Sequence, residues 1–191
     1  MADRWDLDPN HSVFGFSAKH MMFTTVRGRF DEFEGWVDIE GDEYRTAHGE
    51  LVIKTASVDT GVADRDAHLR SPDFFDVERY PEMRFVSSGI ERIDNGRYSI
   101  TGDLTIKDVT KRVQVEAEVG QQINDPWGNE RVALSVAGKI NRKDWGLNWN
   151  MALEAGGFLV SDTINLEVEA TFVHKLPVAA GDLVGAAQAA K

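Results

Sequence analysis

The chain contains no cysteine. A disulfide framework, a thiolate metal site and a cysteine nucleophile are therefore excluded. Basic residues are also in short supply, because 21 Lys and Arg stand against 32 Asp and Glu and give a formal net charge of −11. This balance argues against a nucleic-acid-binding protein, whose affinity depends largely on neutralising phosphates. It also disfavours adsorption to anionic lipid surfaces.

Long hydrophobic runs are missing as well. Apolar residues never exceed three in succession, so the sequence predicts no transmembrane helix and no stable insertion into a membrane. Residues 1–6 lack the apolar stretch of a signal peptide, and we therefore expect a cytoplasmic protein; a periplasmic form whose signal had been removed would give the same sequence. With 42% apolar and 28% charged residues, the composition is typical of a folded globular domain.

Strict alternation of apolar and polar residues is the most informative pattern that is present. It occurs in residues 98–106, 112–119 and 163–172; in the last of these, Ile164 and Leu166 begin an apolar series on one parity. Successive side chains of a strand point to opposite faces, so each stretch predicts a strand with one buried and one wet face. We expect an all-β fold, a single antiparallel barrel or sandwich of about eight strands.

Other segments refine this expectation. Residues 26–39 are strand-like throughout, and their glycines indicate bends. Residues 62–70 predict a short helix that interrupts the β pattern, and Asn-Gly within residues 94–96 predicts a primed hairpin turn. We expect one domain over residues 1–175, followed by an Ala- and Gly-rich tail over residues 176–191 that is loosely ordered.

Several long blocks of the sequence resemble the YceI family, in order and with similar spacing, from residue 5 to about residue 173. These blocks are residues 7–12, 15–20, 25–30, 57–61, 65–76, 80–81, 102–106 and 141–147. The resemblance implies a lipocalin-like barrel that holds a long apolar or amphiphilic ligand, with polyisoprenoids as the usual ligand. Trp36 stands where the family more often has a small polar residue, and its parity, opposite to that of Val37, places it outside the barrel.

The inward parity of the predicted strands is mostly apolar, which suits a ligand held by burial of its surface. The family resemblance implies that this ligand, the expected partner, is an isoprenoid-type lipid such as a polyisoprenoid or an isoprenoid quinone. We expect no cofactor, no metal ion and no catalytic residues. A homodimer is compatible with such a barrel. The predicted ligand contacts are Phe14, Phe16, Ala18, His20, Val37, Ile39, Leu51, Ile53, Phe74, Phe75, Phe85, Leu104, Val136 and Trp145.

Two rival functions remain open at this point. The first is an interaction protein with a solid barrel core, in which exposed Trp36 and Trp149 dock a stress-related partner. The second is a small-molecule enzyme that uses His20 with a nearby carboxylate, although the five histidines show no metal-ligand spacing. Phe74 and Phe75 could act as a plug or as a lid.

The charged residues between 64 and 70 have two possible uses. On a short helix Asp64 and His68 would be i, i+4 neighbours, which predicts local ion pairing. Alternatively, the cluster forms a polar rim that contacts a phosphate or quinone head group, for which Arg27, Arg29 and Arg70 are the candidates.

Overall fold

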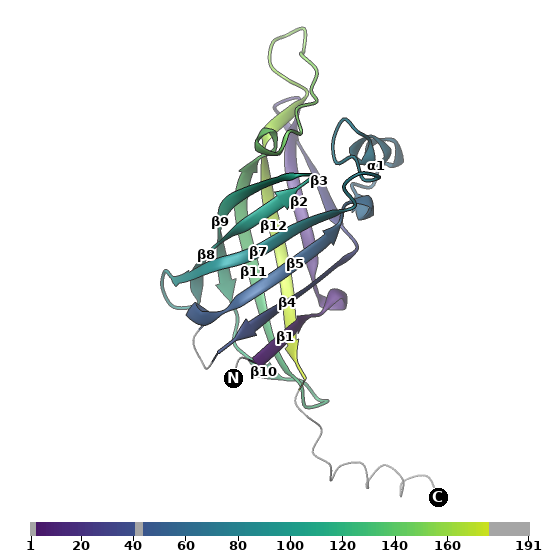
Figure 1. Ribbon diagram of the computed structural model, residues 1–191. Helices are drawn as coiled ribbons and strands as arrows, with labels where there is room; N and C mark the ends of the chain where they lie inside the picture. The colour runs from purple at the N-terminus through teal and green to yellow at the C-terminus, as the bar shows by residue number, and fades with distance from the viewer. Residues whose placement is uncertain (1–2, 41–43, 176–191) are drawn as a thin grey trace, which may run out of the picture.

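The computed structural model describes residues 3–40 and 44–175 (Figure 1). One α-helix, α1 (Ala63–Arg70), and four 3-10 helices (Pro9–His11, Tyr44–Thr46, Thr55–Ser57 and Arg142–Trp145) accompany the strands in this part of the chain. The strands are β1 (Asp3–Leu7), β2 (Val13–His20), β3 (Thr24–Phe30), β4 (Phe33–Ile39), β5 (His48–Lys54), β6 (Val58–Asp59), β7 (Glu82–Arg92), β8 (Arg97–Ile106), β9 (Val109–Val119), β10 (Ile123–Asn124), β11 (Glu130–Asn141) and β12 (Val160–His174).

Eight of these strands form a closed antiparallel barrel, one of the two architectures that the alternation allowed and the one that the family resemblance implied. The order around the ring is β12, β1, β4, β5, β7, β8, β9 and β11, and the ring closes where β11 pairs with β12. This last ladder is continuous, from the pair Glu130 and His174 to the pair Asn141 and Thr163. Because the ring is closed, it has an inner and an outer face, and the two parities of each strand fall on different faces.

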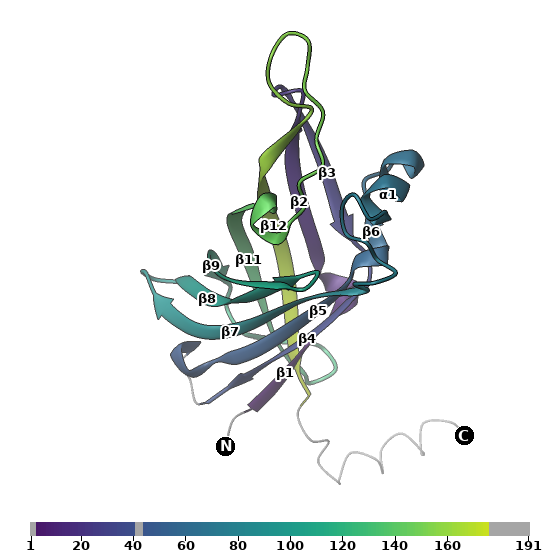
Figure 2. The same ribbon diagram turned by 45° about the horizontal axis from the view of Figure 1, so that its top comes forward.

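Three of the ring positions are filled by long strands that break in the middle. β1 continues as β2 along the same edge of β12. In the same way, β3 continues as β4, and β5 continues as β6. The breaks lie side by side, since the Asp31 amide donates to the Ser57 carbonyl (3.2 Å) and the Lys54 amide donates to the Glu32 carbonyl (2.9 Å). β2, β3 and β6 thereby bend away from the lower ring, and α1 lies beside β3 and β6 (Figure 2).

The predicted strand over residues 26–39 is therefore two strands, and its bend is not at a glycine. Gly28 and Gly35 both sit inside regular ladders, whereas the chain breaks at Asp31 and Glu32. The reason is that β3 pairs with β2 and β6, while β4 pairs with β1 and β5, so the two halves follow different neighbours.

The turn between β7 and β8 also differs from the prediction. Gly96 has φ +86°, but Asn95 is not among the residues with positive φ, so the turn is not of the primed type that needs both. The Ile93 amide donates to the Arg97 carbonyl at 2.9 Å, and Gly96 alone supplies the left-handed residue of the turn.

The predicted helix is present as α1, and its polar residues fix it to the barrel. Arg70 donates to the carbonyls of Ala56 (2.8 Å) and Val58 (2.7 Å), next to β6. The expected pairing of Asp64 with His68 is not formed; His68 Nε2 instead lies 2.9 Å from Asp73 Oδ2. No helix in the described part of the chain is long and apolar enough to cross a membrane.

Buried side chains gather at both ends of the barrel and along one wall. The cluster nearest α1 includes Phe30, Val58 and Phe74, and the cluster at the opposite end is built on Trp5 and Val132. The predicted tail, residues 176–191, lies outside the described residues, and the division at residue 175 stays a prediction.

An ion-pair network ties the end of the barrel opposite α1. Arg131 Nη1 lies 2.6 Å from Asp8 Oδ2, and Arg131 Nε lies 2.8 Å from Asp125 Oδ2. The Arg131 hydrogen bond, followed by bonds from Asn129 and Trp127, holds the pKa of Asp125 far below its ordinary value of 3.8. At Asp8, burial raises the pKa of the carboxyl group. Hydrogen bonds from Arg131, His11 and Asn10 together outweigh burial, so that the pKa of Asp8 is also lowered.

This network predicts a specific loss of stability in acid. A lowered carboxyl pKa stabilises the fold above the unfolded-state value of about 3.9, and this contribution disappears as the pH falls through the folded-state value. Asp125→Asn should therefore lower the free energy of unfolding at neutral pH, and the deficit should shrink steadily below about pH 4. Urea unfolding across a pH series measures both, with the exposed Asp144→Asn as control. A deficit that does not change with pH would contradict this account.

Candidate ligand cavity

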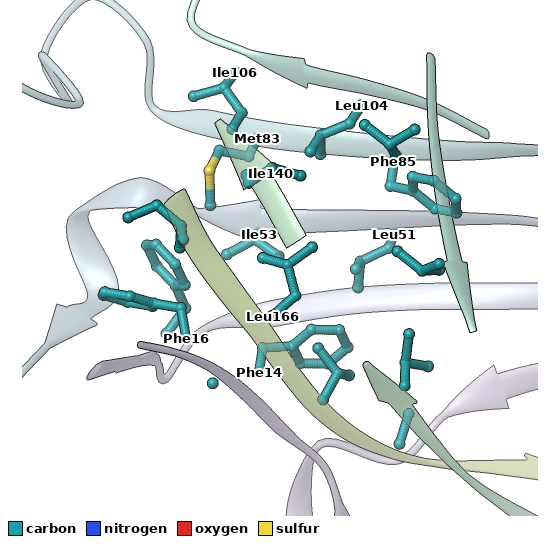
Figure 3. Close-up of a pocket in the computed structure, with 18 of the residues that line it drawn as sticks. Phe14, Phe16, Leu51, Ile53, Met83, Phe85, Leu104, Ile106, Ile140 and Leu166 are labelled. Atoms are coloured by element: carbon teal, nitrogen blue, oxygen red, sulfur yellow. The ribbon is translucent and has the colours of Figure 1, made fainter. Parts of the chain in front are cut away.

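The inside of the ring is not filled. It holds a cavity of about 640 Å³ that is bordered by residues from β1, β2, β3, β4, β5, β7, β8, β9, β11 and β12. Figure 3 shows Leu51, Phe85 and Leu104 on one wall and Phe14 and Leu166 on another, all apolar and turned towards the same space. A volume of this size is within the range of ligand pockets, about 300–1,000 Å³.

Inward-facing glycines keep this space open by giving the larger side chains somewhere to lie. A Cβ built on Gly28 would stand 2.5 Å from Phe16 Cζ, and one on Gly102 would stand 2.3 Å from Phe85 Cζ. Both rings therefore lie against a glycine of the wall, since any side chain there would displace them. The aliphatic side chain of Val115 lies against Gly138 in the same way, since a Cβ built on Gly138 would stand 2.7 Å from it.

The structure brings nearly all of the predicted contact residues together around this cavity. These are Phe14, Phe16, Ala18, His20, Val37, Ile39, Leu51, Ile53, Phe74, Phe75, Phe85, Leu104 and Val136. Strand parity found most of them because inward residues of a closed ring share one space. That they contact a ligand stays a prediction.

Trp145 is the exception and does not border the cavity. It is 2% exposed, belongs to the buried cluster near α1, and donates from Nε1 to the Leu104 carbonyl at 3.1 Å. It lies in a 3-10 helix after β11, where the parity of the strand no longer applies.

Phe74 and Phe75 pack into the end of the barrel nearest α1. The Phe75 ring meets Phe30 edge-on, with ring centroids 5.6 Å apart, and the Phe74 ring lies 5.1 Å from His68. Phe74 is buried, and both residues border the cavity. Their packing makes them part of the wall at this end.

Trp149, which the sequence suggested as an exposed docking residue, borders the cavity instead. Its ring centroid lies 4.5 Å from that of His68 and 5.5 Å from that of Phe74. Because it lies in the irregular segment 146–159, no periodicity signals its position. Trp36 is half-buried beneath Arg4, whose guanidinium lies 4.2 Å over the ring, so neither tryptophan offers a free face.

Five of the ionisable residues that border the cavity lie towards α1: His20, Asp64, Arg65, His68 and Arg142. The sequence predicted His20 as a ligand contact and offered the cluster that contains Asp64, Arg65 and His68 as an alternative polar rim. The other ionisable residues at the border are Lys19, Glu50, Arg84, Tyr44 and Tyr98. Glu50 and Arg84 form an ion pair with each other at 2.6 Å.

The arginines suggested for a head group are used elsewhere. Arg29 pairs with Asp31 (2.7 Å) and Asp59, Arg70 binds backbone carbonyls, and Arg27 lies 3.9 Å from Glu167. None of the three borders the cavity, because each belongs to the outer parity or to the anchoring of α1.

Arg142 is a buried charged residue at this end, with 4% of its surface exposed. It donates to the carbonyls of Ser161 (3.0 Å) and Trp149 (2.9 Å), and so ties the irregular segment to β12. Burial lowers the pKa of Arg142, and the Asp162 carboxylate, 3.5 Å from Nη2, opposes that change. The hydrophobic pattern of the sequence carries no signal for this residue.

Comparisons with known proteins identify the family of this chain. The family model described as the YceI-like domain matches residues 5–172. The chain belongs to the YceI family. A UPF0312 protein of Photorhabdus laumondii is 39% identical over 142 residues, which are 73% of this chain and 72% of that protein.

Solved structures of YceI-like proteins have the same fold. The crystal structure of the Campylobacter jejuni YceI protein matches with a TM-score of 0.72 and 33% identity, over 83% of this chain and 90% of that one. A structure described as a polyisoprenoid binding domain from Saccharophagus degradans matches with a TM-score of 0.66 and 17% identity, over 90% of this chain and 98% of that one. At 17% identity the second likeness concerns the fold.

The role of the glycines in this YceI cavity can be tested at Gly28, whose nearest neighbours are all side-chain atoms. Gly28→Ala should push the Phe16 ring into the lumen, destabilise the fold by about 1–3 kcal/mol, and weaken binding of the apolar fluorophore N-phenyl-1-naphthylamine. Fluorescence titration measures the binding. Gly89→Ala, where an added Cβ meets no atom within 4 Å, is the matched control. Equal fluorophore binding by both variants would show that Gly28 does not keep the space open.

Proposed function

We propose that this protein binds a long apolar or amphiphilic lipid of the isoprenoid type inside its barrel and stores or carries it without changing it chemically. The observation that supports this most strongly is the cavity of about 640 Å³ with a wall of Val, Ile, Leu, Ala and Phe side chains. Apolar walls with few directed polar groups favour binding by burial of surface. The name of the Saccharophagus degradans domain, a polyisoprenoid binding domain of this fold, supports the same class of ligand.

Burial alone provides enough free energy for such a ligand. Each methylene group removed from water contributes about 0.8 kcal/mol, so about 25 of them reach the practical ceiling of about 20 kcal/mol for non-covalent binding. Ordering the chain and losing its free motion consume part of this gain. Burial of surface alone therefore does not determine which chain length is bound. The length of the cavity and the fit of the head group would determine it.

The uneven distribution of charge gives the proposed ligand an orientation. Arg65, His68 and Arg142 border the cavity near α1, while the middle of the wall is lined by residues such as Leu51 and Val136. An amphiphile would keep its polar head among the former and its hydrocarbon among the latter, because a polar group buried without partners is costly. We propose that the head group lies at the α1 end.

The rival functions fit these observations less well. A solid barrel core is incompatible with a cavity of this volume. For catalysis at His20, a carboxylate would have to lie within hydrogen-bond reach of the ring, and within residues 3–40 and 44–175 the His20 ring has no such contact. We therefore propose binding and not catalysis.

Filling the lumen provides the test. Val136 faces the cavity and its neighbour Ser135 faces solvent on the same strand, so Val136→Trp and Ser135→Trp add the same side chain to opposite faces. Organic extraction of the purified full-length proteins, followed by mass spectrometry, should recover an isoprenoid-type lipid from the wild type and from Ser135→Trp. Val136→Trp should yield at least about tenfold less, because the indole occupies the space of the chain.

Folding has to be verified in parallel, because overpacking can cost about 1–3 kcal/mol. Circular dichroism of both variants serves this purpose, and Val136→Phe is the milder substitute should the Trp variant unfold. Equal lipid recovery from well-folded inward and outward variants would refute binding in the lumen. Recovery of a different lipid class would refute the isoprenoid assignment alone.

A further inference from the structure

Two loops at the α1 end of the barrel project beyond it and expose apolar side chains. Met21, Met22 and Phe23, in the turn between β2 and β3, are 53%, 65% and 86% exposed, and Met151 and Phe158 in the segment 146–159 are also exposed. Figures 1 and 2 both show this turn and this segment extending past the other strands. These five residues are called the apolar tip below.

The two loops form one continuous surface. The Met21 amide donates to the Leu159 carbonyl at 2.8 Å. The Met22 side chain packs directly against the backbone of Gly157, where an added Cβ would lie 2.5 Å from its sulfur. Met21 and Met22 both have positive φ, 51° and 61°, a conformation that is uncommon for residues other than glycine and that clusters at functional sites.

Charged residues are nearly absent from the two loops that carry the apolar tip, although 28% of the chain is charged. Residues 20–26 contain no Asp, Glu, Lys or Arg, and residues 146–160 contain only Glu154. Lysines stand at its base. Lys19 donates to Thr25 Oγ1 (2.8 Å), and Lys143 lies 5.8 Å from the Phe158 ring centroid and 2.9 Å from Asp162. Apolar and aromatic residues with lysines behind them are the arrangement that enters the headgroup layer of a bilayer.

The apolar tip is also continuous with the cavity. His20 precedes Met21 in the chain and Leu159 follows Phe158, and both border the cavity. A projecting knob of separate flexible side chains suits a soft lipid surface, into which each one can sink.

We propose that the apolar tip inserts into the surface of a lipid bilayer and places the α1 end of the barrel against it. The net charge of −11 disfavours an anionic surface, so the partner is a bilayer of zwitterionic phospholipid. Insertion there would let an apolar ligand pass between bilayer and barrel with little exposure to water. This inference extends the proposed function but does not depend on the identity of the ligand.

Flotation with phosphatidylcholine vesicles that contain no isoprenoid tests the proposal directly. The full-length protein should float with the vesicles, and Phe23→Asp should reduce the bound fraction by about tenfold, since it places a charge in the apolar tip. The bound fraction should change little between about 0.1 and 1 M salt, because the contact is apolar. Trp127→Asp is the matched control, because Trp127 is 81% exposed on the β10–β11 loop at the opposite end.

Two results would overturn the proposal: failure of the wild type to float, and equal flotation of the two Asp variants. If the wild type does not float but forms a dimer that Phe23→Asp abolishes, the apolar tip is assigned to a second copy of the chain. Phe23 does not border the cavity, so lipid extraction from the Phe23→Asp variant separates loss of membrane contact from loss of ligand binding.

Discussion

The continuous ladder between β11 and β12 is the constraint on which the rest of the structure depends, because it closes the ring. A closed ring of eight strands has a fixed girth, wide enough either to be filled by its own side chains or to hold one small ligand. Here the side chains leave a cavity of about 640 Å³. Gly28 and Gly102 increase the free space by letting aromatic rings lie against the wall. An apolar interior that the protein's own side chains leave unfilled favours the binding of an apolar ligand.

Much of this architecture could be predicted from the sequence, for a physical reason. The period of two is a local property of strands, so it assigned Phe14, Leu51 and Val136 to a common inner face without knowledge of strand order. The helix at α1 was also predictable, because its residues interrupt that period and are followed by Pro72. The rest depended on contacts between distant segments. The break at Asp31 follows from pairing with different neighbours. The place of Trp145 follows from a 3-10 helix after β11, and that of Trp149 from an irregular segment that is held by Arg142.

The two ends of the barrel differ in chemistry. The end opposite α1 is tied by the pairing of Arg131 with Asp8 and Asp125 and exposes Trp127. The end near α1 combines the ionisable border of the cavity, the aromatic cluster around His68 and the apolar tip. Under the proposed function this difference makes one end structural and the other the site of exchange, so that binding and delivery would take place at the same end.

The most direct test of the central claim is a high-resolution crystal structure of the protein purified without delipidation. The account predicts elongated, continuous density along the lumen, in contact with Phe14, Leu51 and Leu166 and with its bulkier end near Arg65. Side chains that meet across the axis, or a lumen that holds only ordered water, would contradict it.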